Sequence, residues 1–115
     1  MTLTASPEFE RVYRNGSVYR GRLFSVHALP NTLGEPRLGL SVSKKVGTAV
    51  NRNKVRRRLK EMFRSSAKRL PRDLDFVISA RPAAAEASFE ELNEEFSRSV
   101  HRICKSAGAK DAGVS

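Results

Sequence analysis

The sequence of 115 residues contains a single cysteine, no tryptophan, and only 12 acidic residues against 22 basic ones. Cys104 has no second cysteine to pair with, which excludes an internal disulfide and is typical of proteins of the reducing cytoplasm. No apolar run approaches the roughly 20 residues that span a bilayer, so we expect no membrane partner. The N-terminal segment MTLTASPEFE lacks the basic and apolar regions of a signal peptide, and we therefore predict a cytoplasmic protein.

The excess of basic residues is concentrated in one segment of the chain. The formal net charge is +10, which on a chain of single-domain size indicates a polyanionic partner such as nucleic acid. Twelve basic residues and one acid, Glu61, lie between positions 44 and 72, so that this segment carries +11 and the rest of the chain −1. A surface charged only for solubility would instead mix both signs along the chain.

Turn residues and hydrophobic periodicity divide the chain into helices and strands. Helices are predicted at about 6–15, 48–69 and 88–105, the last opened by a capping box of Ser88 and Glu91. Strands are predicted at about 23–29, 38–42 and 74–80, with a short edge strand at 17–20. This order predicts an α+β fold in which helices pack on one mixed sheet. We expect a single domain over residues 1–105, and a disordered tail formed by the small, polar residues 106–115.

Cationic side chains lie together on one side of the long predicted helix. At 100° per residue, its apolar positions fall within about 100° of arc, and these positions are Val55, Leu59, Met62, Phe63 and Leu70. One flank of that stripe carries a basic face, which consists of Arg52, Asn53, Arg56, Arg57, Lys60 and Arg64. Charges spaced by three and four residues repel one another, whereas a phosphate backbone would stabilise them through counterion release. A solvated face is the alternative, but the segregation of charge favours RNA binding. Lys54 and Arg58 lie on the other flank.

Stacking surfaces for single-stranded RNA have weaker signals in the sequence. Phe9, Tyr13 and His27 are candidates, although each could equally be an ordinary core or surface residue. Spacing favours the core for Phe9 and leaves the other two open. The strand near 38–42 has a small, polar side formed by Gly39, Ser41 and Ser43, and Lys44 and Lys45 follow at its end. Such a side would leave a shallow groove in which a nucleic-acid backbone could lie close to the sheet.

The chain offers few groups for hydrolysis by the protein itself, which usually needs clustered carboxylates or histidines that hold metal ions. The glutamates at 90, 91, 94 and 95 are interpreted as a solvated acidic face of the last helix. Asp73 and Asp75 are interpreted as turn residues, and His27 and His101 have no partner at a suitable spacing. We therefore predict no catalytic residue and no metal ligand in this chain.

The segment from Arg37 to Arg64, RLGLSVSKKVGTAVNRNKVRRRLKEMFR, resembles the signature region of the bacterial ribonuclease P protein. In that family a strand ending in SVSKK leads through a glycine turn into a helix that opens with Arg-Asn-Arg. SPEFERVYRNG is similar to the first helix of the family, DLDFVISAR to its last strand, and the helix beginning SFEEL to its final helix. The resemblance covers about residues 6–105.

The resemblance implies a fold and two RNA-binding sites. The long helix would form a left-handed crossover between parallel strands, opposite to the usual hand. Contacts to the catalytic RNA would come from Arg52, Asn53, Lys54, Arg56, Arg57, Lys60 and Arg64. A central cleft for the single-stranded 5′ leader of precursor tRNA would be lined by Phe9, Tyr13, His27, Ser41, Ser43 and Lys45. Lys54 stands where the family often has arginine, so its contact would be that of a single charge and not a bidentate one. His27 stands where tyrosine is common, and an imidazole would stack more weakly.

The implied function is that of the protein subunit of ribonuclease P, which assists endonucleolytic removal of the 5′ leader from precursor tRNA. The RNA subunit would be the catalyst, with Mg²⁺ in its active site and one protein per RNA. A structural RNA-binding protein of ribosomal type is the alternative, since it would share the basic face but need no leader cleft. A protein-only nuclease would need the missing carboxylate cluster, and a helix-turn-helix protein would need a helix before the basic one.

Overall fold

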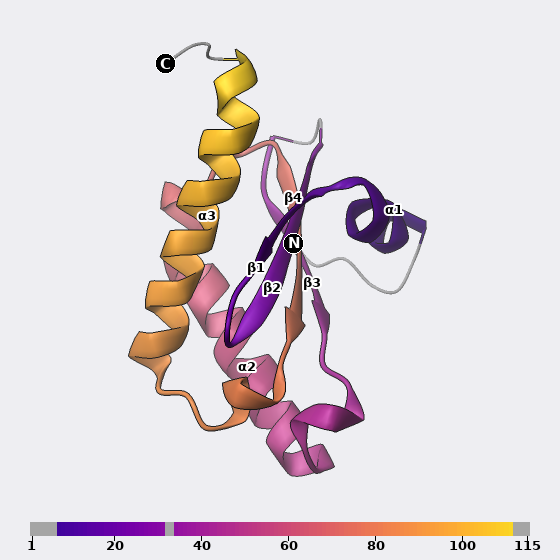
Figure 1. Ribbon diagram of the computed structural model, residues 1–115, viewed down its shortest axis with the longest axis vertical. Coiled ribbons are helices and arrows are strands. Elements are labelled where there is room, and N and C mark those ends of the chain that lie inside the picture. Colours follow the sequence, from indigo (N-terminus) through magenta and orange to yellow (C-terminus); the bar gives the residue numbers. More distant parts are fainter. Residues whose placement is uncertain (1–6, 32–33, 112–115) are drawn as a thin grey trace.

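The structure is a computed structural model that describes residues 7–31 and 34–111 (Figure 1). The helices are α1 (Pro7–Asn15), α2 (Ala49–Ser66) and α3 (Phe89–Asp111). The strands are β1 (Ser17–Arg20), β2 (Phe24–Pro30), β3 (Arg37–Ser41) and β4 (Leu74–Ala80). Short 3-10 helices follow β3, α2 and β4, and these are η1 (Lys44–Val46), η2 (Ala67–Arg69) and η3 (Pro82–Ala85). The predicted α+β fold and its order of elements are confirmed, including the short strand at 17–20.

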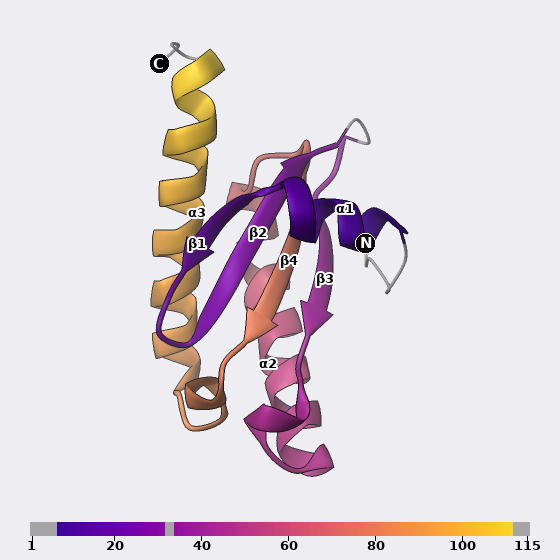
Figure 2. The ribbon, with the colours of Figure 1, turned by 45° about the vertical axis from the view of Figure 1, so that its right-hand side comes forward.

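The four strands form one mixed sheet in the order β1-β2-β4-β3. β2 pairs antiparallel with both β1 and β4, whereas β3 and β4 are parallel and are connected through α2. In Figure 2, β3 and β4 both run downward, and α2 climbs behind the sheet while the chain moves from β3 leftward to β4. This path is a left-handed crossover, as the resemblance implied and opposite to the hand of nearly all such connections.

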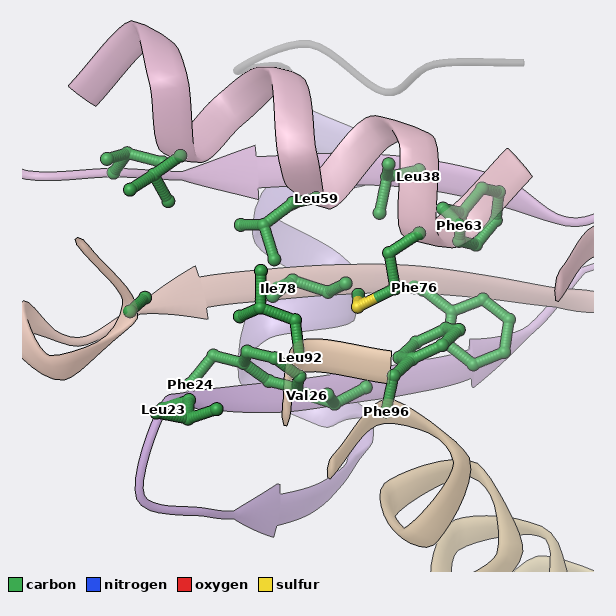
Figure 3. Close-up of a cluster of buried hydrophobic side chains, with 14 of the residues drawn as sticks. Leu23, Phe24, Val26, Leu38, Leu59, Phe63, Phe76, Ile78, Leu92 and Phe96 are labelled. Carbon is green, nitrogen blue, oxygen red and sulfur yellow. The ribbon is translucent and has the colours of Figure 1, made fainter. Parts of the chain in front are cut away.

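The main core lies between one face of the sheet and the two long helices. Figure 3 shows Leu59 and Phe63 of α2 on one side of β4, and Leu92 and Phe96 of α3 on the other. The rings of Phe63, Phe76 and Phe96 meet with centroids 5.7 to 6.2 Å apart. Every apolar residue predicted for the stripe of the long helix is buried. Each such side chain stabilises the fold by roughly 1.5–3 kcal/mol, which fixes α2 with its basic flank outward.

The opposite face of the sheet is only partly covered. α1 packs there through Val12, which contacts Val77 of β4, with Phe9 and Leu29 beside them. Figure 2 shows α1 in front of the sheet, on the side away from α2. Because α1 has nine residues and lies over one end of β2 and β4, polar side chains of the strands occupy the remainder of this face. The placement of Phe9 agrees with the core position that its spacing favoured.

Two helix ends differ from the sequence-based boundaries. α2 ends at Ser66 and continues as the 3-10 turn η2 to Arg69, one residue before the buried Leu70. α3 continues to Asp111, past residue 105 where a tail was expected. Ala107, Ala109 and Lys110 favour helix in that stretch despite Gly108. Residues 112–115 of the expected tail lie outside the described residues. None of the described helices has an apolar stretch long enough to cross a membrane.

Candidate nucleic-acid interface

The start of α2 is fixed by a turn and a side-chain cap. Gly47 has φ of 144°, a backbone conformation that side chains rarely allow, and it separates η1 from the helix. Thr48 then caps α2, its Oγ1 accepting a hydrogen bond of 3.2 Å from the backbone N–H of Asn51. The first turn contains no acidic residue, so the positive end of the helix dipole adds to the nearby cationic side chains. This end of α2 is therefore suited to anions.

The basic face of α2 is accessible and has few internal partners. Asn53, Arg57, Lys60 and Arg64 are exposed, and Arg52 and Arg56 are half-buried. Arg56 donates to Oδ1 of Asn53 over 3.1 Å, which joins two members of the face. Arg64 approaches Glu61 at 3.3 Å, but both side chains are largely exposed and such a pair contributes little. The Nε of Arg52 is buried without a hydrogen-bond partner among the described residues.

Arg58, on the other flank of the helix, has a structural contact. Its Nη1 donates to the backbone carbonyl of Ala87 over 2.8 Å, which ties α2 to the segment before α3. Arg57 and Arg58 are adjacent in sequence, yet one is exposed and the other is half-buried and engaged. The basic residues of this segment therefore divide into those that hold the fold and those that face solvent.

A second polar surface lies on the sheet face that α1 covers in part. The Tyr13 ring on α1 and the His27 ring on β2 lie together, with centroids 4.5 Å apart and planes inclined by 31°. Tyr13 is 47% exposed, whereas His27 is 7% exposed. Burial lowers the pKa of His27, an interaction with the backbone of Val77 works against this effect, and the charge of Arg20 adds to it. His27 is therefore held neutral beneath the exposed tyrosine at physiological pH.

A row of serines crosses three strands beside this aromatic pair. Ser25 on β2 is in register with Ser79 on β4, which is in register with Ser41 on β3. Gly39, opposite Val77 in the neighbouring row, is buried and has no side chain to block approach to the sheet. We call Tyr13, His27 and these three serines the polar sheet face. Arg81 donates to Ser25 over 3.2 Å, and the Oγ of Ser79 and Nδ1 of His27 are buried without partners among the described residues.

The predicted cleft residues are only partly brought together. Tyr13 and His27 are in contact, Ser41 lies in the adjacent row, and Phe9 packs against the cluster of Val12 and Val77. Ser43 and Lys45 follow the end of β3, where the Oγ of Ser43 accepts a hydrogen bond of 3.3 Å from the backbone N–H of Lys45. Sequence reasoning missed Ser25, Ser79 and Arg81. The alternation of apolar and polar residues along 24–28 and 74–80 could have placed Ser25 and Ser79 on one side of the sheet. It could not have placed them in the same row, which depends on the register of the strands.

Two interpretations of acidic residues are wrong. Asp75 is no turn residue: it is fully buried within β4 and accepts hydrogen bonds from Arg37 at 2.8 and 2.7 Å and from Asn31. Glu95 does not belong to a solvated face, since it is buried and accepts from the backbone N–H groups of Leu23 and Phe24 at 2.9 and 3.2 Å. Asp75 thus neutralises the side chain of Arg37, whereas Glu95 satisfies two backbone donors at the start of β2. Within residues 7–31 and 34–111, no group of three or more His, Cys, Asp or Glu side chains could hold a metal ion.

Known proteins are similar to this chain in sequence and in fold. The family model described as Ribonuclease P matches residues 1–104. The ribonuclease P protein component of Bacillus pumilus is 37% identical over 107 residues, which are 91% of this chain and 87% of that protein. The component of Caldanaerobacter subterraneus is 42% identical over 96 residues, 84% of this chain and 83% of that protein.

Solved structures agree with the sequence comparison. The RNase P protein from Thermotoga maritima superposes with a TM-score of 0.80 at 27% identity, covering 90% of this chain and 97% of that one. The RNase P protein of Staphylococcus aureus gives a TM-score of 0.72 at 30% identity, covering 92% of this chain and 94% of that one. The similarity therefore extends over nearly the whole of each chain.

Proposed function

Since the chain belongs to the ribonuclease P protein family, we propose a division of labour between its basic face and its polar sheet face. Membership gives the chain the role of the protein subunit of ribonuclease P in tRNA processing, and it implies ribonuclease P RNA as a partner. In our proposal the basic face binds the RNA subunit, and the polar sheet face receives the 5′ leader of precursor tRNA.

The proposal for the basic face is supported by charge that the fold leaves unbalanced. The exposed side chains of Arg57 and Lys60 form no hydrogen bond or ion pair within the described part of the chain. Guanidinium groups suit phosphates because they donate two parallel hydrogen bonds. The face would contribute affinity through counterion release, and Lys54, half-buried on the other flank, would add a point charge.

The proposal for the polar sheet face is supported by its combination of a stacking ring with serine hydroxyl groups. Tyr13 offers an exposed aromatic surface to a base, and such stacking tolerates any sequence. The half-buried Ser25 and Ser41 could hydrogen-bond to phosphate or ribose, and Ser43 and Lys45 would extend this path beyond β3. A leader of varied sequence requires contacts of this kind, directed to the backbone and the faces of the bases.

The observation that carries the proposal is the placement of the two surfaces on different sides of the sheet. Figure 2 shows α1 and α2 on opposite sides of the sheet. α2 packs on the side of Phe76, whereas Tyr13 and His27 lie on the side of Val77. One protein could then contact the RNA subunit and the leader at the same time without competition. We propose one protein per RNA subunit on this ground.

We further propose that the RNA subunit carries out the cleavage and that the Mg²⁺ ions of the reaction lie in the RNA active site. In support, two of the carboxylates, those of Asp75 and Glu95, are buried and accept internal hydrogen bonds. The protein would act by neutralising phosphate charge between two RNAs and by holding the leader. We place this activity in the cytoplasm, where the lone cysteine would remain reduced.

Reconstitution tests this function against the alternative of a structural RNA-binding protein. The chain is combined with a bacterial ribonuclease P RNA, and 5′ maturation of precursor tRNA is followed at a magnesium concentration where the RNA alone is inactive. We expect cleavage only when both subunits are present. Binding without any stimulation of cleavage would favour the structural alternative, and metal-dependent cleavage by the chain alone would contradict catalysis by the RNA.

A further inference from the structure

A hollow lies at the outer edge of β3, between that strand and the second half of α2. Its volume is about 330 Å³, within the range of ordinary small-ligand pockets of roughly 300–1,000 Å³. It is lined by Glu35, Pro36, Leu38, Lys60, Phe63, Arg64 and Ala67. The hollow is distinct from the polar sheet face, because Leu38 and Phe63 belong to the core on the α2 side of the sheet.

The walls of this hollow combine apolar and cationic groups. Leu38 and Phe63 are 4% and 7% exposed, and they supply an apolar floor with an aromatic ring. Lys60 and Arg64 are one helical turn apart and exposed at the rim. The side chain of Lys60 makes no hydrogen bond or ion pair to any other described residue, and the Arg64 side chain remains 74% exposed beside Glu61. A planar apolar group that carries a negative charge would match this arrangement.

The strand that borders the hollow can also donate and accept hydrogen bonds. β3 is at the edge of the sheet and pairs with β4 on one side only. The backbone groups on its other side therefore have no strand partner within the described residues, as is usual for an edge strand. A nucleobase has donors and acceptors along its edges, so a base lying on the apolar floor could bond to this backbone.

We propose that this hollow binds one unpaired nucleotide of the RNA subunit, with the base on Phe63 and Leu38 and the phosphate on Lys60 and Arg64. The inference rests on the proposed function, because both cations belong to the basic face that we assign to that RNA. The leader is not the occupant in this proposal, because Tyr13 and His27 lie across the sheet from the hollow. In this proposal the basic face contacts phosphates along the RNA and also binds one base in the hollow.

A substitution that fills the hollow tests the proposal without a change of charge. Ala67 is half-buried, with φ of −52° and ψ of −39°, so Ala67→Leu fits the backbone while it fills space in the hollow. We expect this variant to bind ribonuclease P RNA roughly tenfold more weakly, the scale of one lost base–aromatic contact. The matched control is Ser65→Leu, which adds the same side chain at an exposed position outside the hollow and is expected to bind as the wild type.

A second measurement needs no variant of the protein. Ribonuclease P RNAs that each lack the base at one unpaired position are titrated with the wild-type chain. One of these RNAs is expected to bind about tenfold more weakly than the intact RNA, and Ala67→Leu is expected to weaken that RNA no further. Such non-additivity is the signature of two changes that remove the same contact.

The outcomes separate the hollow from the function on which it depends. If the wild-type chain binds the RNA but no missing base weakens binding, the nucleotide site is overturned and the basic face stands. If Ala67→Leu weakens every RNA by the same factor, the hollow contacts no single base and the proposal is again overturned. If the wild-type chain shows no salt-sensitive binding to the RNA, the proposed function fails first.

Discussion

The phenol ring of Tyr13 on α1 lies against the imidazole of His27 on β2, with ring centroids 4.5 Å apart. One side of the tyrosine ring is thereby held by a buried neighbour, while nearly half of the residue remains exposed. A ring fixed in this way loses little side-chain entropy when a base stacks on it. This relationship makes Tyr13 the most direct probe of the polar sheet face.

Replacement of Tyr13 by alanine is expected to weaken binding of leader-containing precursor tRNA about tenfold, since a base–aromatic stack is worth roughly 1–3 kcal/mol. Affinity of the reconstituted enzyme is measured for a precursor with a leader and for the same tRNA without one. Tyr13→Phe keeps the ring and serves as the control, with affinity close to that of the wild type. An equal loss for both RNAs in Tyr13→Ala would show that the residue does not act through the leader.

The stability of the protein is expected to fall in mildly acidic solution because of His27. Burial lowers the pKa of His27 below 6.5, so the unfolded chain binds this proton at a higher pH than the folded chain does. The contribution of His27 to the free energy of unfolding is therefore constant above pH 6.5. It decreases as the pH falls from 6.5 to the pKa of His27 in the folded protein. Urea unfolding at pH 7.5 and pH 5 should show a smaller decrease for His27→Phe than for the wild type. The exposed His101 provides the control. If His101→Gln, and not His27→Phe, reduced the loss of stability between pH 7.5 and pH 5, the assignment of that loss to His27 would be refuted.

The ion pair between Arg37 and Asp75 is expected to be important for stability. Burial alone would raise the pKa of Asp75, but hydrogen bonds from Arg37 and Asn31 outweigh it and hold the pKa below its usual value. The side chain of Asp75 is fully buried, so Arg37→Met would leave its carboxylate without the paired cation. We expect this change to lower the free energy of unfolding by about 3–5 kcal/mol. The comparison is Arg14→Met, which breaks an exposed pair with Glu10 and is expected to cost less than about 1 kcal/mol. Equal losses in chemical denaturation would contradict the structural role of Asp75.

Two adjacent arginines of α2 are expected to respond differently to substitution. Arg57→Ala should weaken binding to ribonuclease P RNA and reduce the slope of log Kd against log salt by about 1, with no loss of stability. Arg58→Ala removes the hydrogen bond to the carbonyl of Ala87, so it should lower the free energy of unfolding by roughly 1.5–3 kcal/mol. The pair is tested by RNA titrations at several salt concentrations together with urea unfolding. If both variants lose RNA affinity alike and neither loses stability, the division of the helix into two flanks is wrong.

The local structure of this chain could be predicted well from its sequence. The strand at 74–80 has the predicted boundaries, and the capping box of Ser88 and Glu91 forms with both hydrogen bonds, 2.8 and 3.1 Å long. These features depend on short-range patterns that the residues themselves contain. The left-handed crossover is different, since the general rule of handedness favours the opposite connection and only the family resemblance indicated it.

The parts of the site that were missed depend on strand order and register. Ser25, Ser41 and Ser79 come from three strands, and they form one row only because β4 lies between β2 and β3. Asp75 could not be distinguished from a turn residue before Arg37, 38 positions away in sequence, was placed beside it. The hollow at the edge of β3 likewise requires the packing of α2 on the sheet, which no local pattern specifies.

The central claim is that the basic face of α2 docks on the RNA subunit, and the salt dependence of that binding tests it most directly. The dissociation constant of the wild-type chain for ribonuclease P RNA is measured across a range of monovalent salt at fixed magnesium. Binding is predicted to weaken steeply, as a straight line of log Kd against log salt, because each phosphate contact releases counterions. An affinity that does not change with salt, or no association at all, would contradict the account.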